Sequence, residues 1–243
     1  ASVAAVVVGN EVLLRGEQPA GRLAEMIGEV RDAVAQPVTY ADVWERWIEV
    51  PELARRVDFA TVHILPYWED EPVAVEAAVA HVGQVRRRVG ERLAGVPILI
   101  GETGWPAAGR QREGAVPSPV NQALYFHGLL ALFAEEGWDY NLIEAFDQPW
   151  KRALEGTVGG HWGFLDGSAQ VKFAWGGRLS DHPLWAWQAA AGALLALAVL
   201  LCGRRAAAGR LPGLLLLALV TGLAVPWWAE QLPLVSLRPG AWA

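Results

Sequence analysis

The sequence predicts an α/β protein with a parallel sheet, followed by two helices apolar and long enough to cross a membrane. Within residues 2–147, apolar β-branched runs alternate with segments whose apolar residues recur at helical spacing. Two of these runs end in glycine and a carboxylate, and the chain from residue 184 onward is dominated by Leu and Ala. Alternation of strands and helices is typical of parallel sheets with crossover helices.

The predicted elements follow one another along the first two thirds of the chain. Strands are predicted at 2–8, 37–40, 59–65, 97–100 and 141–147, and helices at 19–35, 42–57, 75–89 and 118–136. Pro51 must kink or split the second helix, because a proline ring disrupts a helix interior. Ser118 and Pro119 suit the cap and first position of the fourth helix, which stops at Gly137.

The strand order leaves two architectures open, an open doubly wound sheet and most of a barrel. An eight-stranded barrel usually needs about 250 residues, and the segment before the apolar tail ends near residue 173. The barrel therefore requires three strands ahead of residue 2. The chain also opens directly in a strand at Ala1, so we expect that its N-terminus has been cut.

Composition and residue spacing argue against nucleic acid, disulfide, metal and cofactor sites. The formal net charge of -6 and the pI near 5.4 give no electrostatic footprint for nucleic acid. Cys202 is the single cysteine, so no intrachain disulfide can form. Histidine and cysteine spacings typical of a metal site are absent from the sequence, as is a glycine-rich phosphate loop. We therefore expect neither a metal nor a cofactor.

The apolar tail predicts two membrane spans, 184–202 and 211–228, since a spanning helix needs about 20 apolar residues. The loop 203–210 between them carries three Arg and no acid, which places it in the cytoplasm. Four Trp flank the outer ends of the spans: Trp185, Trp187, Trp227 and Trp228. The preceding domain (1–177) and the tail 229–243 then face outward. The alternative is a buried helical hairpin of a soluble protein.

Acidic and aromatic residues follow the predicted strands. If the strands are parallel neighbours, Glu11, Tyr67, Glu102 and either Glu144 or Asp147 emerge at one rim, where α/β folds place their chemistry. Two carboxylates facing each other across a cleft are the minimum for retaining glycoside chemistry, with one as nucleophile and the other as acid/base. Glu11 and Glu102 lie at matching strand ends, which favours this function over solvated loop positions.

Further residues near these strand ends suit a sugar site. Asn10 is placed to hydrogen-bond a sugar 2-hydroxyl, and Tyr67 to donate to the nucleophile. Trp105, Trp150 and Trp162 offer faces for stacking on sugar rings, although packing is the alternative for each. His63 lies within a predicted strand, where an interior polar group is favoured over a catalyst.

Three motifs together resemble glycoside hydrolase family 17, a family of β-1,3-glucanases and β-1,3-glucan transglycosylases on a (β/α)8 barrel. They are 8–12 (VGNEV), 100–106 (IGETGWP) and 144–151 (EAFDQPWK), and 161–165 (HWGFL) resembles the closing stretch of the family. The resemblance covers residues 2–173 and implies a TIM barrel that lacks strands one to three in this chain. It also implies Glu11 as acid/base at strand four, Glu102 as nucleophile at strand seven, and sugar contacts from 144–151, including Trp150 and Lys151.

The favoured hypothesis is a retaining hydrolase or transglycosylase acting on β-1,3-glucan, with the lipid bilayer as its second partner. A domain followed by two membrane helices resembles the bacterial membrane-anchored members of the family. This resemblance implies an inner-membrane protein with its catalytic domain in the periplasm. The alternatives are a tethered glucan-binding or sensor domain without turnover, and an open-sheet protein whose strand-end acids are unrelated. The sequence does not distinguish hydrolysis from transfer, and it indicates no oligomeric state.

Overall fold

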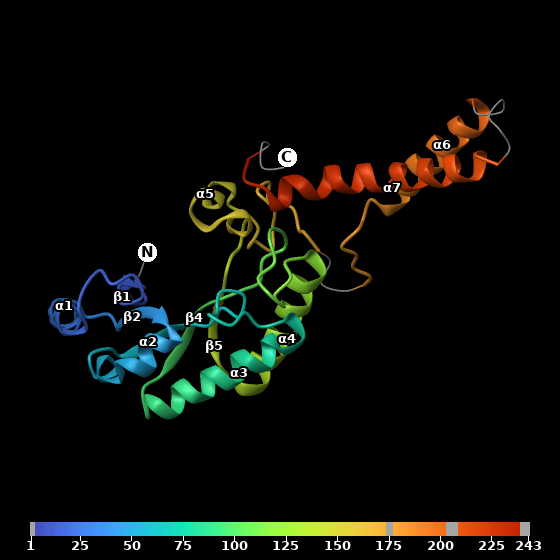
Figure 1. The fold of residues 1–243 in the computed structure, drawn as a ribbon. Helices are drawn as coiled ribbons and strands as arrows, with labels where there is room; N and C mark the ends of the chain where they lie inside the picture. The colour runs from blue at the N-terminus through green and yellow to red at the C-terminus, as the bar shows by residue number, and fades with distance from the viewer. Residues whose placement is uncertain (1–2, 174–176, 203–208, 239–243) are drawn as a thin grey trace.

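A computed structural model describes residues 3–173, 177–202 and 209–238 (Figure 1). Its first part is a five-stranded sheet in the order β1-β2-β3-β4-β5, and every neighbouring pair is parallel. The strands are β1 (Val6–Asn10), β2 (Val38–Val43), β3 (Phe59–His63), β4 (Ile98–Thr103) and β5 (Asp139–Leu142). The parallel α/β architecture predicted from the sequence is therefore confirmed.

Helices connect the strands in the order expected for crossover connections. They are α1 (Ala20–Ala33), α2 (Trp44–Glu49) with the 3-10 helix η1 (Pro51–Arg55), α3 (Val75–Arg92) and α4 (Pro119–Glu136). The predicted helix 42–57 is split, because Pro51 begins a new turn after Val50. α4 is capped as predicted: the Ser118 hydroxyl accepts the Asn121 N–H at 3.0 Å, and Gly137 ends the helix in the left-handed conformation.

The core is formed where the helices pack against the sheet. Its largest fully buried side chains include Tyr40, Trp47, Tyr67, Trp105, Tyr125, Phe126, Phe133 and Trp162. β1 and β5 form the two edges of the sheet, and Val7 on β1 is 54% exposed. An exposed β-branched residue on an edge strand is what a barrel lacking neighbouring strands leaves uncovered.

The segment after β5 departs from the prediction. The strand begins at Asp139 and ends at Leu142, so the predicted strand 141–147 is largely wrong. Residues beyond it make isolated bridges to a later loop instead, such as that between Phe146 and Leu165. Short helical turns follow as η2 (Pro149–Lys151), α5 (Arg152–Glu155) and η3 (Thr157–Gly160).

Two long apolar helices complete the described chain. α6 (Trp185–Cys202) and α7 (Leu211–Val235) lie side by side and extend away from the sheet (Figure 1). A Cβ on Gly222 would lie 2.4 Å from the Gly192 Cα, so two glycines allow this close approach of the backbones. α7 continues past the predicted end at Trp228 to Val235, and most of the predicted arginine loop, 203–208, lies outside the described residues.

Candidate active site

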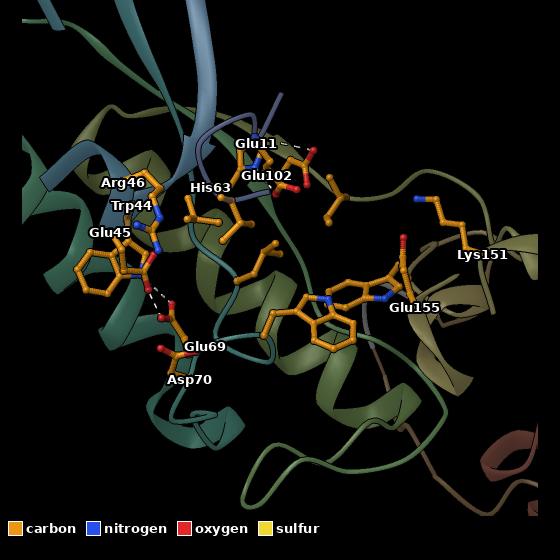
Figure 2. A pocket seen from close by; sticks show the side chains of 16 residues that line it. Glu11, Trp44, Glu45, Arg46, His63, Glu69, Asp70, Glu102, Lys151 and Glu155 are labelled. Carbon is orange, nitrogen blue, oxygen red and sulfur yellow. Dashed lines mark hydrogen bonds and ion pairs between the residues drawn. The ribbon is translucent and has the colours of Figure 1, made fainter. Parts of the chain in front are cut away.

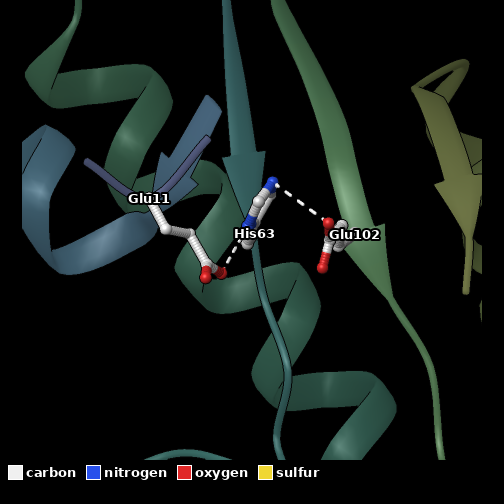
Figure 3. Close-up of side chains that lie close together, drawn as sticks. All are labelled: Glu11, His63 and Glu102. Atoms are coloured by element: carbon white, nitrogen blue, oxygen red, sulfur yellow. Dashed lines mark hydrogen bonds and ion pairs between the residues drawn. The ribbon is translucent and has the colours of Figure 1, made fainter. Parts of the chain in front are cut away.

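The carboxyl edge of the sheet gathers two acids and a histidine from three strands. Glu11 follows β1, His63 is the last residue of β3, and Glu102 lies near the end of β4 (Figure 3). His63 Nδ1 is 3.0 Å from Glu11 Oε1, and His63 Nε2 is 3.8 Å from Glu102 Oε1. One oxygen of each carboxylate and a ring nitrogen all lie within 4.8 Å of one another.

Glu11 is held in place by the neighbouring strand. Its backbone has φ +55°, a left-handed conformation that is unfavourable for a residue with a side chain. Its N–H donates to the Ala41 carbonyl at 2.8 Å, and the Leu13 N–H donates to the Tyr40 hydroxyl at 3.0 Å. The buried Asp42 carboxylate accepts the Tyr40 hydroxyl and the Leu13 N–H. β2 thus fixes the turn that presents the Glu11 side chain.

Gly101 on β4 has no side chain, which leaves room for the His63 ring beside Glu102. A Cβ on Gly101 would lie 2.3 Å from Thr61 Cγ2 and 3.1 Å from His63 Cδ2. His63 and Glu102 are paired across β3 and β4, and the Ile64 N–H donates to the Glu102 carbonyl at 2.9 Å. The glycine that precedes Glu102 in the sequence therefore makes room for the imidazole ring.

The two carboxyl groups differ in their electrostatic surroundings. The hydrogen bond from His63 lowers the pKa of Glu11, and the charge of Arg15 acts in the same direction against the opposing effect of burial. Burial raises the pKa of Glu102 and outweighs the attraction of His63. Burial therefore disfavours the charged form of Glu102, whereas the hydrogen bond from His63 favours the charged form of Glu11.

These residues open into a cavity of about 450 Å³, a volume typical of small-ligand sites. Trp44, Glu45, Arg46, Glu69 and Asp70 line one end of it, and Lys151 and Glu155 the other (Figure 2). Trp68 is 38% exposed in this cavity and stacks on Trp162 with ring centroids 6.2 Å apart. The site thus combines acids with a flat aromatic wall.

The end of the cavity next to α2 is acidic. Glu69 accepts the Trp44 indole N–H at 3.1 Å and lies 3.1 Å from His81 Nε2. Burial, with the charges of Glu69 and Asp70, raises the pKa of Glu45 to about 7. A carboxyl group in these surroundings can donate as well as accept a hydrogen bond near neutral pH.

Two of the predicted sugar contacts lie elsewhere. Tyr67 is buried, and its hydroxyl donates to the Arg110 carbonyl at 2.7 Å, so the predicted donation to the nucleophile is wrong. Trp105 is fully buried, donates to the Val116 carbonyl at 3.1 Å and packs against Tyr125. Trp105 is therefore a core residue, and its predicted stacking on a sugar ring is wrong.

The predicted residues after β5 form a hydrogen-bonded cluster beside the cavity. Lys151 lines the cavity, and its Nζ donates to Glu144 at 2.7 Å. Asp147 accepts the Gly163 N–H at 2.9 Å and Lys172 Nζ at 2.8 Å, which fastens the closing stretch to this loop.

Two further predicted contacts are exposed and adjoin cavity-lining residues in the chain. Trp150 is 61% exposed, and its indole N–H donates to Gln148 at 3.2 Å. Asn10 is exposed at the end of β1, next to Glu11. Both positions leave these side chains accessible to a ligand, as their predicted roles require.

The sequence does not predict the positions of several residues at the cavity. His63 is interior as predicted, with 1% of its side chain exposed, yet it also contacts both acids. Trp68 follows Tyr67 directly, and the sequence gives no periodic signal for which of the two rings faces the cavity. Among the described residues, one group lies closely enough to hold a metal ion: Glu11, His63 and Glu102. The sequence predicts no metal site.

The partial parallel barrel and its paired carboxylates define a glycoside hydrolase type of domain. A family model described as the BtgE/BtgC glycoside hydrolase domain matches residues 1–163. The chain belongs to this family, and the resemblance to glycoside hydrolase family 17 is confirmed.

Known proteins agree with this assignment. A glucan 1,3-beta-glucosidase of Schizosaccharomyces pombe is 31% identical over 163 residues, which cover 61% of this chain and 50% of that protein. A glycoside hydrolase family 17 beta-1,3-glucanosyltransferase structure from Rhizomucor miehei shares 32% identity with a TM-score of 0.64, covering 70% of this chain and 62% of that one. An active-site mutant of the same enzyme, in complex with laminaritriose, has a TM-score of 0.62 at 32% identity. The chain spans only about half to three fifths of the length of these proteins.

The partly buried carboxyl group of Glu102 yields a prediction about stability. Because its folded pKa is raised, the stability that it contributes is fully present below its unfolded pKa of about 4.3 and is lost as the pH rises through the folded value. We expect Glu102→Gln to raise the thermal unfolding midpoint at pH 7 and to change it less at about pH 3.5. Calorimetry of the detergent-solubilised chain measures both.

The exposed Glu91 on α3 supplies the control, and Glu91→Gln should leave the midpoint unchanged at either pH. A midpoint for Glu102→Gln at or below that of the wild type at pH 7 would contradict the assigned burial effect.

Proposed function

We propose that residues 1–177 are the C-terminal part of the (β/α)8 barrel of a retaining enzyme that acts on β-1,3-glucan. The observation that carries the proposal is the approach of Glu11 and Glu102, whose oxygens lie within 4.8 Å of each other at one edge of the sheet. Retaining glycosidases hold their two carboxyl groups about 5 Å apart, whereas inverting enzymes need about 6.5–9.5 Å to admit a water.

The two acids divide the reaction between them. Glu102 attacks the anomeric carbon, and Glu11 protonates the departing glycosidic oxygen, which leaves a covalent glycosyl-enzyme. Glu11 then removes a proton from the incoming hydroxyl, which displaces Glu102. These roles rest on the family resemblance, and the close geometry of the pair supports them.

The substrate class comes from the similar proteins and from the shape of the site. Those proteins carry names that refer to β-1,3-glucan, and one was solved with laminaritriose. In this chain the exposed face of Trp68 offers a surface against which a sugar ring can stack. Lys151 lines the cavity, and Asn10 and Trp150 directly precede the lining residues Glu11 and Lys151 as further sugar contacts.

Hydrolysis and transfer use the same intermediate and differ in whether water or a sugar hydroxyl attacks it. The competing function is a tethered glucan-binding domain without turnover. It is favoured by the burial that raises the pKa of Glu102, because this residue must be ionised to attack.

Turnover distinguishes these functions. The gene product with its full N-terminal sequence, incubated with laminari-oligosaccharides, should yield shorter sugars if it hydrolyses and longer ones if it transfers, as read by mass spectrometry. Glu102→Gln and Glu11→Gln should each lower the rate by at least about a thousandfold, since both acids act in both steps. Glu91→Gln is the matched control. Binding of the oligosaccharide by the wild type without any product would replace this proposal with the binding domain.

We further propose that α6 and α7 span a membrane and tether the domain to its outer, periplasmic face. Both helices are long and apolar enough, and only 11% of each apolar window is buried. The exposed rings of Trp185, Trp187 and Trp228 lie towards the ends that adjoin the domain, where an aromatic belt is expected. The intervening arginines favour a cytoplasmic position for the opposite end.

Cysteine labelling tests this topology. In a Cys202→Ser background, Ser180→Cys lies before α6 and Gly209→Cys lies just before α7. We expect an impermeant maleimide to label Ser180→Cys in intact spheroplasts, and to label Gly209→Cys only after lysis. Labelling of Gly209→Cys in intact spheroplasts would contradict the orientation, and recovery of the protein in the soluble fraction would contradict the spans.

A further inference from the structure

His63 lies between the two acids and faces one of them with each ring nitrogen (Figure 3). We propose that His63 and Glu102 are ligands of a site for a divalent cation of the zinc class (Zn²⁺ or Co²⁺), in which Glu11 orients the imidazole ring. An ion bound there occupies the carboxylate that the reaction uses as nucleophile. Binding of the ion is independent of the proposed function, whereas its effect on turnover rests on that function.

The distance between the histidine and Glu102 suits a shared ion better than a hydrogen bond. Nε2 of His63 is 3.8 Å from Glu102 Oε1, which exceeds the range of hydrogen bonds. Zinc binds imidazole nitrogen and carboxylate oxygen at about 2.0–2.2 Å, so two such ligands at tetrahedral angles lie about 3.4 Å apart. A movement of about 0.4 Å therefore lets both atoms bind one ion.

Glu11 leaves the second ring nitrogen of His63 free to bind a metal. Nδ1 is 3.0 Å from Glu11 Oε1, and an ionised carboxylate can only accept this hydrogen bond, which places the proton of the neutral ring on Nδ1. The lone pair is then on Nε2, which has no hydrogen-bond partner among the described residues. Histidines that bind metals commonly donate their other N–H to a carboxylate in this way.

The histidine is held firmly, and the cavity side of the pair stays open. Only 1% of the His63 side chain is exposed, and the bare backbone of Gly101 lies against its ring. The Glu102 side chain is 33% exposed, and among the described residues no hydrogen bond holds its carboxylate. Both residues line the cavity of about 450 Å³, which has room for water in the remaining coordination positions of the ion.

The charge of the cavity favours a cation. Its lining contains six carboxyl groups and two cationic side chains, Arg46 and Lys151. Arg15 opposes this excess from a position 3.4 Å from Glu11. The remaining excess of acids attracts divalent cations. An imidazole beside a carboxylate favours ions of the zinc class over Mg²⁺ and Ca²⁺, which prefer oxygen ligands.

Titration calorimetry with Zn²⁺ tests the site without requiring turnover. The protein is the detergent-solubilised gene product with its full N-terminal sequence and Cys202→Ser, because a thiolate also binds zinc. We expect a Zn²⁺ site whose Kd rises at least about tenfold in His63→Gln and in Glu102→Gln, since loss of even an outer partner costs about 10–100-fold in metal affinity. Mg²⁺ at the same concentration should not compete.

Two other histidines supply the controls. His182→Asn changes an exposed residue before α6, and His81→Gln removes the imidazole that lies 3.1 Å from Glu69 at the acidic end of the cavity. Both variants should keep the wild-type Kd for Zn²⁺. A Kd that is unchanged in either His63→Gln or Glu102→Gln, or that rises in His81→Gln instead, would overturn the proposal.

Competition in the wild type does not depend on the folding of any variant. S-linked laminaritriose, which the enzyme cannot cleave, should raise the apparent Kd for Zn²⁺, because the sugar covers Glu102. In assays on laminari-oligosaccharides, Zn²⁺ should raise KM and leave kcat unchanged, and a chelator should restore the rate. Zn²⁺ that binds with unaltered affinity beside the bound trisaccharide would overturn the proposal.

The binding and turnover results separate this site from the proposed function. A wild type that turns over β-1,3-glucan and binds no Zn²⁺ would overturn the metal site and leave the proposed function intact. A wild type that binds Zn²⁺ through His63 and Glu102 without any turnover would support the metal site and overturn the proposed function.

Discussion

The close approach of two carboxyl groups at the edge of a parallel sheet is the constraint around which this domain is built. Like charges at this distance, partly removed from water, repel each other and favour a proton on one of them. The surrounding structure opposes that repulsion locally: Asp42 and Tyr40 fasten the turn that carries Glu11, and Gly101 admits the imidazole ring beside Glu102. The strained backbone of Glu11 is maintained by these contacts.

A segment that borders the cavity also contacts the apolar hairpin. The Arg152 guanidinium donates to the Pro233 and Ser236 carbonyls at 2.8 and 2.9 Å, and Arg110 donates to the Val235 carbonyl at 2.9 Å. These carbonyls belong to the end of α7, where a helix leaves backbone acceptors without partners and favours cations. Because Arg152 directly follows Lys151 in the cavity wall, the site and the proposed membrane anchor share one support.

The sequence predicts those parts of the fold and site that follow from local patterns. Buried strands ending at Glu11 and Glu102 are read from apolar runs, and Ser118 marks the start of α4. The predicted roles of Tyr67 and Trp105 are wrong because both residues lie past the strand ends, where no period fixes the side on which a ring packs. The sequence does not predict that His63 contacts both acids, because β3 is largely buried and alternation cannot distinguish a residue facing the site from one facing the helices.

The covalent intermediate is the most direct test of the paired-carboxylate chemistry. A laminaribiosyl fluoride with fluorine at C2 forms the glycosyl-enzyme and releases it slowly, so that the modified peptide can be identified by mass spectrometry. We expect one adduct, on the peptide carrying Glu102, and none in Glu102→Gln. An adduct on Glu11, or no adduct from an enzyme that turns over β-1,3-glucan, would contradict the assignment of Glu102 as nucleophile.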